Sequence, residues 1–164
     1  MAKDTQWIIN IGDLLVSDTG SNVEVRHMVK VEGQDEFKFP IPFSIAVNLQ
    51  KADQGMVLGK FKVSGKIASS CFRCLADVEK ELDFEFDAVF CEVNDENEDC
   101  DSEIKNSCIN FKELFLQEIG LQKPLKFLCK KDCKGLCIDC GENLNLKKCK
   151  CNKINSKFKP QSAK

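Results

Sequence analysis

Three stretches in the first two thirds of the chain alternate apolar and polar residues with the period of a β-strand that has one buried face. The first follows Pro42, the second follows a turn predicted at residues 53–55, and the third ends near residue 90. Their apolar positions are, in order, Phe43, Ile45, Val47 and Leu49; Val57, Phe61, Val63 and Ile67; and Val78, Leu82, Phe84, Phe86, Ala88 and Phe90. Such half-buried strands predict an antiparallel meander with one solvated face.

The segments around these strands are less regular. Residues 8–15 fit either a strand or the start of a short helix, and residues 92–103, with seven acidic side chains, predict a mobile loop. A short helix is expected after Asn110, which with Glu113 has the spacing of a capping box. Gly120 and Pro124 are expected to end that helix, whose apolar face would hold Phe111, Leu114, Phe115 and Ile119.

Charge divides the chain into two predicted domains. Residues 1–122 carry 12 basic and 23 acidic side chains, a net charge of −11, whereas residues 123–164 carry 12 basic and 3 acidic ones, a net charge of +9. We therefore predict an acidic β-rich domain over residues 1–122 and a basic tail over residues 123–164 that meets a polyanion. The alternative is a solvated tail that only balances the acidic body.

The eleven cysteines are many for 164 residues. No apolar run approaches the ~20 residues that a membrane span needs, and the N-terminal residues lack the features of a signal peptide. A cytoplasmic location is therefore expected, and in that location clustered cysteines favour metal binding over disulfides.

The basic tail has the ligand spacing of a structural zinc site. Cys137-Ile138-Asp139-Cys140-Gly141 has the form of a zinc knuckle, and Cys149 and Cys151 project to the same side of an extended segment. Lys, Asp, Asn and Gly surround these cysteines, so they do not fit a set of small buried hydrophobes. We predict that Cys137, Cys140, Cys149 and Cys151 bind one zinc ion.

A second zinc site is a further candidate. Cys71 and Cys74 lie at the predicted tip between the second and third strands, and they could join Cys129 and Cys133. A C-x-x-C pair can also be redox active or simply structural, and this alternative stays open. Cys91, Cys100 and Cys108 belong to no motif and are interpreted as ordinary residues.

Catalysis finds no support in the sequence. His27 is the only histidine, and no nucleophile elbow or phosphate-binding loop is present. Four thiolates around zinc leave no coordination position for a substrate. The predicted fold class is therefore α+β, a β-rich antiparallel meander or partly closed barrel with a short helix and a C-terminal zinc-knuckle tail, without enzymatic activity or a small-molecule substrate.

The motifs resemble those of the YceD family of bacterial and plastid proteins. The resemblance runs from Ile9-Asn10-Ile11-Gly12-Asp13-Leu14-Leu15 through Cys71-Phe72-Arg73-Cys74-Leu75 to Cys133-Lys134-Gly135-Leu136-Cys137, Cys140-Gly141-x-Asn143-Leu144-Asn145 and Cys149-x-Cys151. Ile138 stands where relatives usually have proline. The resemblance implies a non-enzymatic role in the synthesis, processing or stability of large-subunit ribosomal RNA.

Lysines interleave with the cysteine ligands of the tail. Lysines near phosphates add affinity without reading the base sequence, so we predict an RNA-binding set, with large-subunit ribosomal RNA or a pre-ribosomal particle as the partner and no membrane. The set is Arg73, Lys130, Lys131, Lys134, Lys147, Lys148 and Lys150. The lysines could instead offset the −2 charge of a four-thiolate zinc centre. The alternative functions are a zinc-stabilised adaptor for an acidic protein and a thiol-based redox sensor.

Overall fold

The computed structural model describes residues 5–33, 36–52, 55–92, 100–149 and 151. Lys150 and parts of the turn at 53–55 and the acidic loop at 92–103 lie outside them. The chain forms two compact units. We call Met1–Ser69 with Glu79–Leu125 the sheet unit, and Ser70–Val78 with Lys126–Lys164 the cysteine unit. The tip between the two longest strands thus belongs to the same unit as the basic tail.

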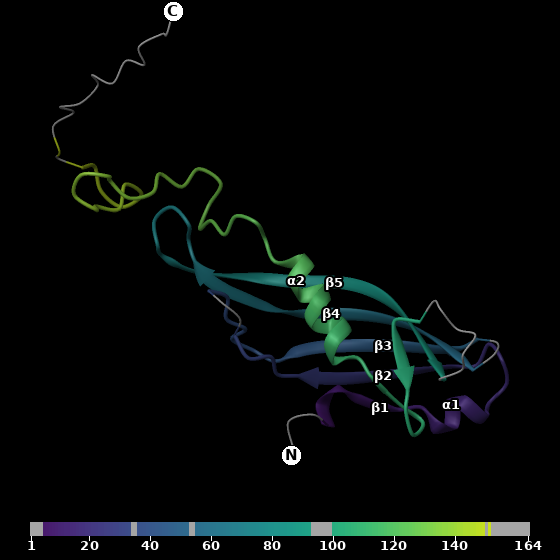
Figure 1. The fold of residues 1–164 in the computed structure, drawn as a ribbon. Coiled ribbons are helices and arrows are strands. Elements are labelled where there is room, and N and C mark those ends of the chain that lie inside the picture. Colours follow the sequence, from purple (N-terminus) through teal and green to yellow (C-terminus); the bar gives the residue numbers. More distant parts are fainter. Residues whose placement is uncertain (1–4, 34–35, 53–54, 93–99, 150, 152–164) are drawn as a thin grey trace, which may run out of the picture. The chain divides into compact units, whose positions relative to one another are not determined.

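A five-stranded sheet forms the sheet unit (Figure 1). Its strands follow the order β2 (Asn22–Val29), β3 (Phe43–Lys51), β4 (Met56–Ser70), β5 (Asp77–Glu92) and β6 (Ser102–Ile104). The pairs β2–β3 and β3–β4 are antiparallel, and β6 runs parallel to the end of β5. The prediction of a β-rich, mostly antiparallel fold is confirmed. Among the described residues the sheet is open, with β2 and β6 at its edges, so they form no closed barrel.

The three predicted strands have the predicted buried faces. Phe43, Ile45, Val47 and Leu49 of β3 are fully buried, and the residues between them are exposed or half-buried. The apolar positions of β4 are buried as well, and those of β5 are buried from Leu82 to Phe90, with Val78 half-buried. Each large aliphatic or aromatic side chain removed from water in this way contributes about 1.5–3 kcal/mol, so the alternation fixes which face the core occupies.

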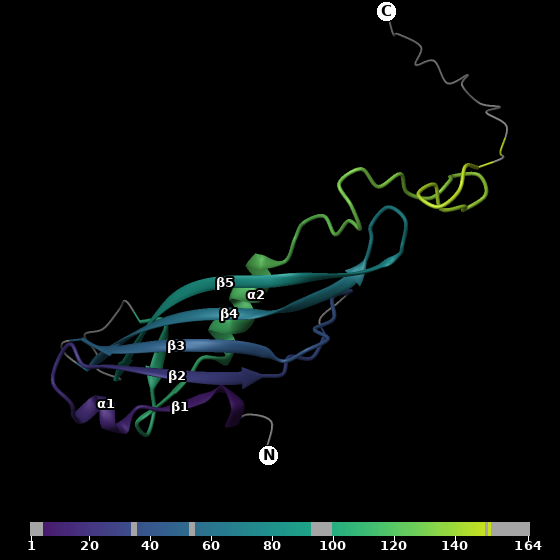
Figure 2. The ribbon, with the colours of Figure 1, turned by 180° about the vertical axis from the view of Figure 1, so that it is seen from behind.

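Helix α2 (Lys112–Gln122) covers the apolar face of the sheet, in front of the strands in Figure 1 and behind them in Figure 2. Phe115 and Ile119 of the helix and the preceding Phe111 are fully buried. The ring centroids of Phe111 and Phe61 lie 5.5 Å apart, as do those of Phe115 and Phe43. Aromatic packing therefore holds the helix in place. A short helix without such packing is only marginally stable in water.

The predicted end of the helix at Pro124 is confirmed, whereas the predicted cap residue Asn110 and the predicted stop at Gly120 were wrong. The residue before the helix is Phe111, whose side chain makes no capping hydrogen bond. Asn110 Oδ1 instead accepts a hydrogen bond from the backbone N–H of Lys112, 3.0 Å away. The helix continues through Gly120 to Gln122, and Lys123 leaves the helical region with ψ of 128°. Pro124 accounts for this end, because the residue before a proline is disfavoured in the α conformation.

Both alternatives for residues 8–15 occur in succession. After a short 3-10 turn, η1 (Thr5–Trp7), strand β1 (Ile8–Asn10) pairs with β7 (Cys108–Asn110), and helix α1 (Gly12–Val16) follows. Ile9, Ile11 and Leu14 are buried there. Within the described residues, no helix has both the length and the apolar character needed to cross a membrane.

Candidate metal centres

Two groups of four cysteines lie in the cysteine unit, and they are the two groups that the sequence predicted. We call Cys71, Cys74, Cys129 and Cys133 cluster A, and Cys137, Cys140, Cys149 and Cys151 cluster B. Within each cluster the four sulfur atoms lie within 4.8 Å of one another. Four cysteine sulfurs gathered in this way are the arrangement that a tetrahedral metal ion needs.

Cluster A joins the hairpin tip to the start of the tail. Cys71 Sγ lies 3.8 Å from Cys133 Sγ, and Cys74 Sγ lies 3.6 Å from Cys129 Sγ. Cys71, Cys74 and Cys133 are buried, and the apolar side chains packed against them are Val78, Leu128 and Leu136. This cluster is shielded from water on the side of those residues.

A tight turn, Cys71 to Leu75, presents the first two sulfurs of cluster A. The backbone N–H of Leu75 donates to the carbonyl of Cys71 (2.9 Å), and Leu75 takes a left-handed conformation with φ of 58°. The backbone N–H of Cys71 donates to the carbonyl of Ala76 at 2.8 Å, which closes the hairpin. The turn directs both side chains of the C-x-x-C pair to one side.

Arg73 connects this turn to the tail. Its Nη1 donates to the carbonyl of Cys133 at 2.9 Å, and its own carbonyl accepts from the backbone N–H of Leu136 at 3.1 Å. Gly135 has φ of 74°, and a β-carbon there would lie 3.0 Å from the Arg73 carbonyl oxygen. The close approach explains the glycine. The guanidinium places a positive charge next to a cluster that would carry four thiolates.

Cluster B is built on a second tight turn. The backbone N–H of Gly141 donates to the carbonyl of Cys137 at 2.9 Å, and Gly141 has φ of 73°. Cys149 Sγ lies 3.3 Å from Cys137 Sγ and 3.4 Å from Cys140 Sγ. Cys140 is exposed and the other three cysteines are half-buried, so cluster B is more open to solvent than cluster A.

Asn145 supports cluster A from the segment between the two cysteine pairs of cluster B. Its Nδ2 donates to Cys133 Sγ at 3.3 Å, and its Oδ1 accepts from the backbone N–H of Lys134 at 2.9 Å. Hydrogen bonds from outer groups of this kind orient metal ligands and favour the thiolate. Asn145 was not among the predicted site residues, although its place in the Asn143-Leu144-Asn145 segment of the family motif was a signal.

Each cluster contains a thiol with a strongly shifted pKa. Hydrogen bonds from the backbone N–H groups of Cys140 and Asp139 lower the pKa of Cys137 to about 7. In cluster A, burial and the neighbouring cysteine sulfurs raise the pKa of Cys129 to about 12. The sulfurs are too close for all four to ionise together, because like charges disfavour one another. A bound cation removes this conflict.

The donor sets fit zinc. Each has four cysteine sulfurs with no histidine or carboxylate among its members, and a tetrahedral four-sulfur site suits zinc or iron–sulfur chemistry. Four thiolates fill the coordination sphere, so each site is suited to hold the fold together rather than to activate a water molecule. The chain could hold two metal ions.

Five of the predicted RNA-binding lysines are described, and all five are exposed: Lys130, Lys131, Lys134, Lys147 and Lys148. They belong to the cysteine unit, as does Arg73, whose guanidinium is bonded to the Cys133 carbonyl. Lys150 lies outside the described residues.

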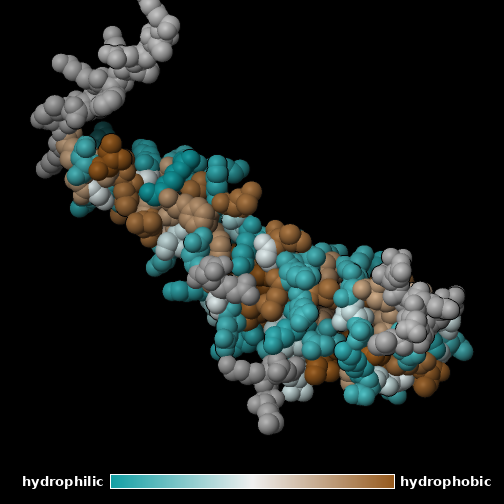
Figure 3. All heavy atoms as spheres, viewed as in Figure 1, coloured by the Kyte–Doolittle hydropathy of each residue, from teal (hydrophilic) through white to brown (hydrophobic). Residues whose placement is uncertain are grey.

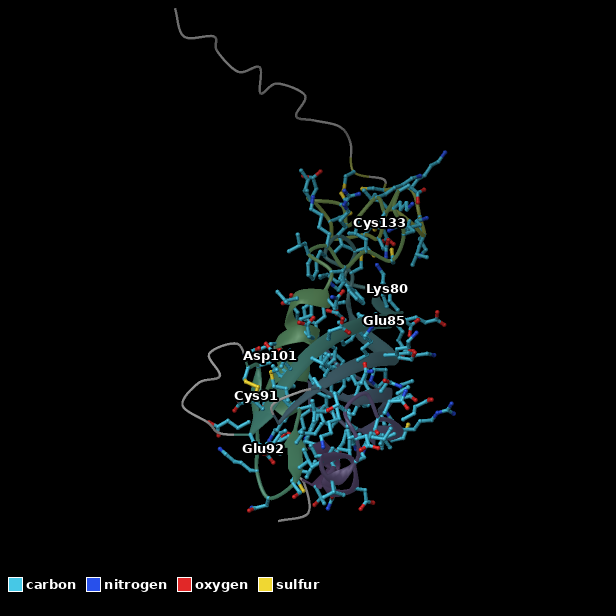
Figure 4. The ribbon with its side chains drawn as sticks, turned by 90° about the vertical axis from the view of Figure 1, so that its right-hand side faces the viewer. Lys80, Glu85, Cys91, Glu92, Asp101 and Cys133 are labelled. Carbon is cyan, nitrogen blue, oxygen red and sulfur yellow. A yellow bond between two sulfur atoms is a disulfide. The ribbon has the colours of Figure 1, made fainter. Side chains whose placement is uncertain are left out.

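A disulfide in the sheet unit was missed. Cys91 and Cys100 are bonded to each other, nine residues apart (Figure 4), so the prediction that they are ordinary residues was wrong. Cys108 is a free thiol. Next to the disulfide, Asp101 binds Val89 twice: the Val89 N–H donates to its Oδ2 at 2.8 Å, and its own N–H donates to the Val89 carbonyl at 2.9 Å. The sequence has no motif at this pair.

Residues 59–161 match the profile of a family described as "Large ribosomal RNA subunit accumulation protein YceD". An uncharacterized protein of Mycobacterium leprae (strain TN) is 27% identical over 115 residues, which are 66% of this chain and 51% of the relative. The chain thus spans about half the length of that curated relative. No solved structure matches the chain significantly.

Proposed function

The chain belongs to the YceD family, and from this membership we propose that it is a non-enzymatic factor in the synthesis, processing or stability of large-subunit ribosomal RNA. The family's description names the accumulation of that RNA and no catalysed reaction. The observation that carries the proposal is the match over residues 59–161, which includes the β4–β5 hairpin and both cysteine clusters.

In this proposal, zinc fixes the shape of the cysteine unit. The unit has few apolar side chains to bury around its cysteines, and small domains of this kind depend on a metal to fold. One ion in cluster A would join the hairpin tip to residues 129–133, and one in cluster B would close residues 137–151. A tail that would otherwise be a flexible basic segment thereby becomes a defined surface.

The positive charge of that surface favours RNA as its partner. The tail from residue 123 onward has a net charge of +9, and the proposed contacts to RNA phosphates are Arg73, Lys130, Lys131, Lys134, Lys147, Lys148 and Lys150. Phosphate contacts by lysine release counterions, so affinity for RNA should fall steeply with salt. The acidic sheet unit would repel phosphates, which confines the contact to the cysteine unit.

The direct test is a charge exchange in the tail. The triple variant Lys147→Gln, Lys148→Gln and Lys150→Gln is expected to bind ribosomal RNA fragments more weakly. Its plot of log affinity against log salt should be flatter by about 0.7 for each lost contact to single-stranded RNA. The matched control is Lys30→Gln, Lys38→Gln and Lys60→Gln, which changes the same charge on exposed residues of the sheet unit.

An unchanged salt slope in the tail variant would show that these lysines are not the contact. Equal loss in the tail variant and in the control would point to net charge alone. If neither the wild type nor any variant binds RNA, while an acidic protein is bound in a salt-dependent way, the adaptor alternative replaces the proposal.

A cellular test separates the biological role from RNA affinity. Deleting the gene should lower mature large-subunit RNA relative to small-subunit RNA. A copy carrying His27→Ala should restore the ratio, because we assign no chemistry to that residue. Copies carrying Arg73→Ala or Cys74→Ser should restore it poorly, because both changes disturb cluster A. A normal RNA ratio in the deletion strain would contradict the proposed role.

A further inference from the structure

The tip between β4 and β5 exposes two large apolar side chains. Phe72 is 47% exposed and Leu75 is 66% exposed, although both lie in the turn that carries two cysteines of cluster A. Phe127, the other aromatic residue described in the cysteine unit, is fully buried. Figure 3 shows hydrophobic residues at the surface of this unit among hydrophilic ones. Among the described aromatic residues of the cysteine unit, Phe72 is thus the one whose ring a ligand can reach.

Leu75 is strained as well as exposed. Its φ of 58° lies in the left-handed region, which a branched side chain rarely adopts. Glycine fills the equivalent position of the other turn, where Gly141 has φ of 73°. Because Leu75 is two-thirds exposed, burial within the chain does not offset its strain. Strained residues of this kind concentrate at binding sites.

Two exposed lysines are the sequence neighbours of residues that hydrogen-bond to this turn. The backbone N–H of Phe72 donates to the carbonyl of Phe127 at 2.9 Å, which brings the exposed Lys126 next to the turn. Arg73 Nη1 donates to the carbonyl of Cys133, so the exposed Lys134 directly follows a second residue that is bonded to the turn. An exposed ring on a turn that is bonded to the sequence neighbours of two lysines suits a ligand that has both flat apolar faces and negative charge.

We propose that this tip binds unpaired nucleotides of RNA, with one base stacked on Phe72 and the flanking phosphates near Lys126 and Lys134. Leu75 would cover the sugar or the neighbouring base. The inference rests on the proposed function, and it deepens that function by naming single-stranded RNA as the ligand. Any base can stack on an aromatic ring, whereas the bases of a duplex are already stacked on one another.

The test compares binding of a short oligouridylate, which stays single-stranded, with binding of an RNA duplex of the same strand length. Phe72→Ala should weaken oligouridylate binding by about 5- to 150-fold, the range expected for one stacked base, and leave duplex binding unchanged. The matched control is Ile138→Ala, because Ile138 is 99% exposed and occupies the position of Phe72 in the other C-x-x-C turn. That variant should bind both RNAs as the wild type does.

A second variant reports stacking directly. Phe72→Trp should keep oligouridylate binding, and its indole fluorescence should be quenched as the RNA is added. The one native tryptophan, Trp7, is 3% exposed and provides a constant background. Metal content and circular dichroism equal to those of the wild type establish that each variant is folded.

The outcomes separate the two proposals. If Phe72→Ala binds oligouridylate as tightly as the wild type, or loses both RNAs equally, or if the tryptophan variant is not quenched, the tip does not stack a base. RNA binding through lysines would then still stand if the wild type binds either RNA. If the wild type binds neither RNA, the proposed RNA contact and this inference both fall.

Discussion

Leu75 and Gly141 occupy the same position in two turns of the same form. Each is the fifth residue of a C-x-x-C turn, and each donates its backbone N–H to the carbonyl of the first cysteine at 2.9 Å. Each has a positive φ, 58° for Leu75 and 73° for Gly141. The two cysteine clusters are therefore built on one turn geometry, which glycine satisfies without strain in cluster B and leucine satisfies with strain in cluster A.

Exchanging these residues should change the zinc affinities of the two clusters in opposite directions. Gly141→Leu is expected to weaken zinc binding by cluster B about 5- to 30-fold, because a left-handed residue with a β-carbon costs roughly 1–2 kcal/mol. Among the described residues beyond its two chain neighbours, no atom lies within 4 Å of the added β-carbon, so the expected cost is that of the backbone conformation. Leu75→Gly should strengthen zinc binding by cluster A, by a smaller factor because glycine also frees the unfolded chain. Competition with a chromophoric chelator measures both, and weaker binding after Leu75→Gly would contradict the account.

Metal content is the second prediction. Purified protein should contain two equivalents of zinc, and Cys74→Ser and Cys140→Ser should each retain one. Cys108→Ser is the matched control, since Cys108 is a free thiol outside both clusters, and it should retain two. Because cluster B is the more exposed site, a chelator should remove one ion fast and one slowly, and Cys140→Ser should abolish the fast phase. Elemental analysis and release kinetics check this, and an unaltered fast phase would assign it to cluster A.

Both the strands and the cysteine clusters could be predicted from local patterns. Phe43 to Leu49 alternate because one face of β3 is in the core, and that alternation is visible in the sequence. The pairing of Cys71 and Cys74 with Cys129 and Cys133 could be proposed because zinc needs four ligands and two C-x-x-C-like pairs were left over. In both cases the physical requirement is strict enough to constrain the sequence.

Edge strands and the disulfide could not be predicted, because their partners leave no such pattern. In β2 only Val29 is buried, and exposed Val23 and Met28 break the expected alternation. The position of β2 follows from its register with β3, in which Val29 pairs with Phe43. Cys91 and Cys100 are brought together because β6 runs parallel to the end of β5. These are tertiary contacts that no local period encodes.

His27 supplies a pH prediction for the sheet unit. Its imidazole packs edge-on near Phe111, with 6.0 Å between the ring centroids, and partial burial lowers its pKa below 6.5. The folded protein thus binds the proton less readily than the unfolded chain. The free energy of unfolding should be unaffected above about pH 6.5 and should fall as the pH drops through the window below it.

Because His27 is the only histidine, its NMR titration gives the pKa without an assignment problem. The decrease of stability between about pH 7 and pH 5 should be smaller in His27→Gln than in the wild type, since other titrating groups are common to both. An NMR pKa above 6.5 would show that a favourable charge outweighs burial at this ring.

The disulfide between Cys91 and Cys100 should stabilise the sheet unit. It links two positions nine residues apart, and restricting a loop of that length in the unfolded chain is worth roughly 2–3 kcal/mol. The covalent link also supports the short parallel pairing of β5 and β6, which covers only Phe90 to Glu92 on β5. The double variant Cys91→Ala and Cys100→Ala should therefore unfold in urea with a free energy lower by about that amount. Cys108→Ala, which removes a free thiol, is the control.

Thiol counting tests whether this bond forms in the protein as isolated. In denaturant with a chelator and no reductant, nine of the eleven cysteines should be alkylated, and all eleven after reduction. Reductant should lower the stability of the wild type but not that of the Cys91/Cys100 variant, which separates the disulfide from any effect on the zinc thiolates. Reducing compartments keep cysteines in the thiol form. Alkylating the protein inside cells and counting its free thiols therefore reports whether the disulfide that links β6 to β5 is present there. Eleven alkylated cysteines before reduction would leave the parallel pairing of β5 with β6, and the two hydrogen bonds between Asp101 and Val89, to hold these segments together.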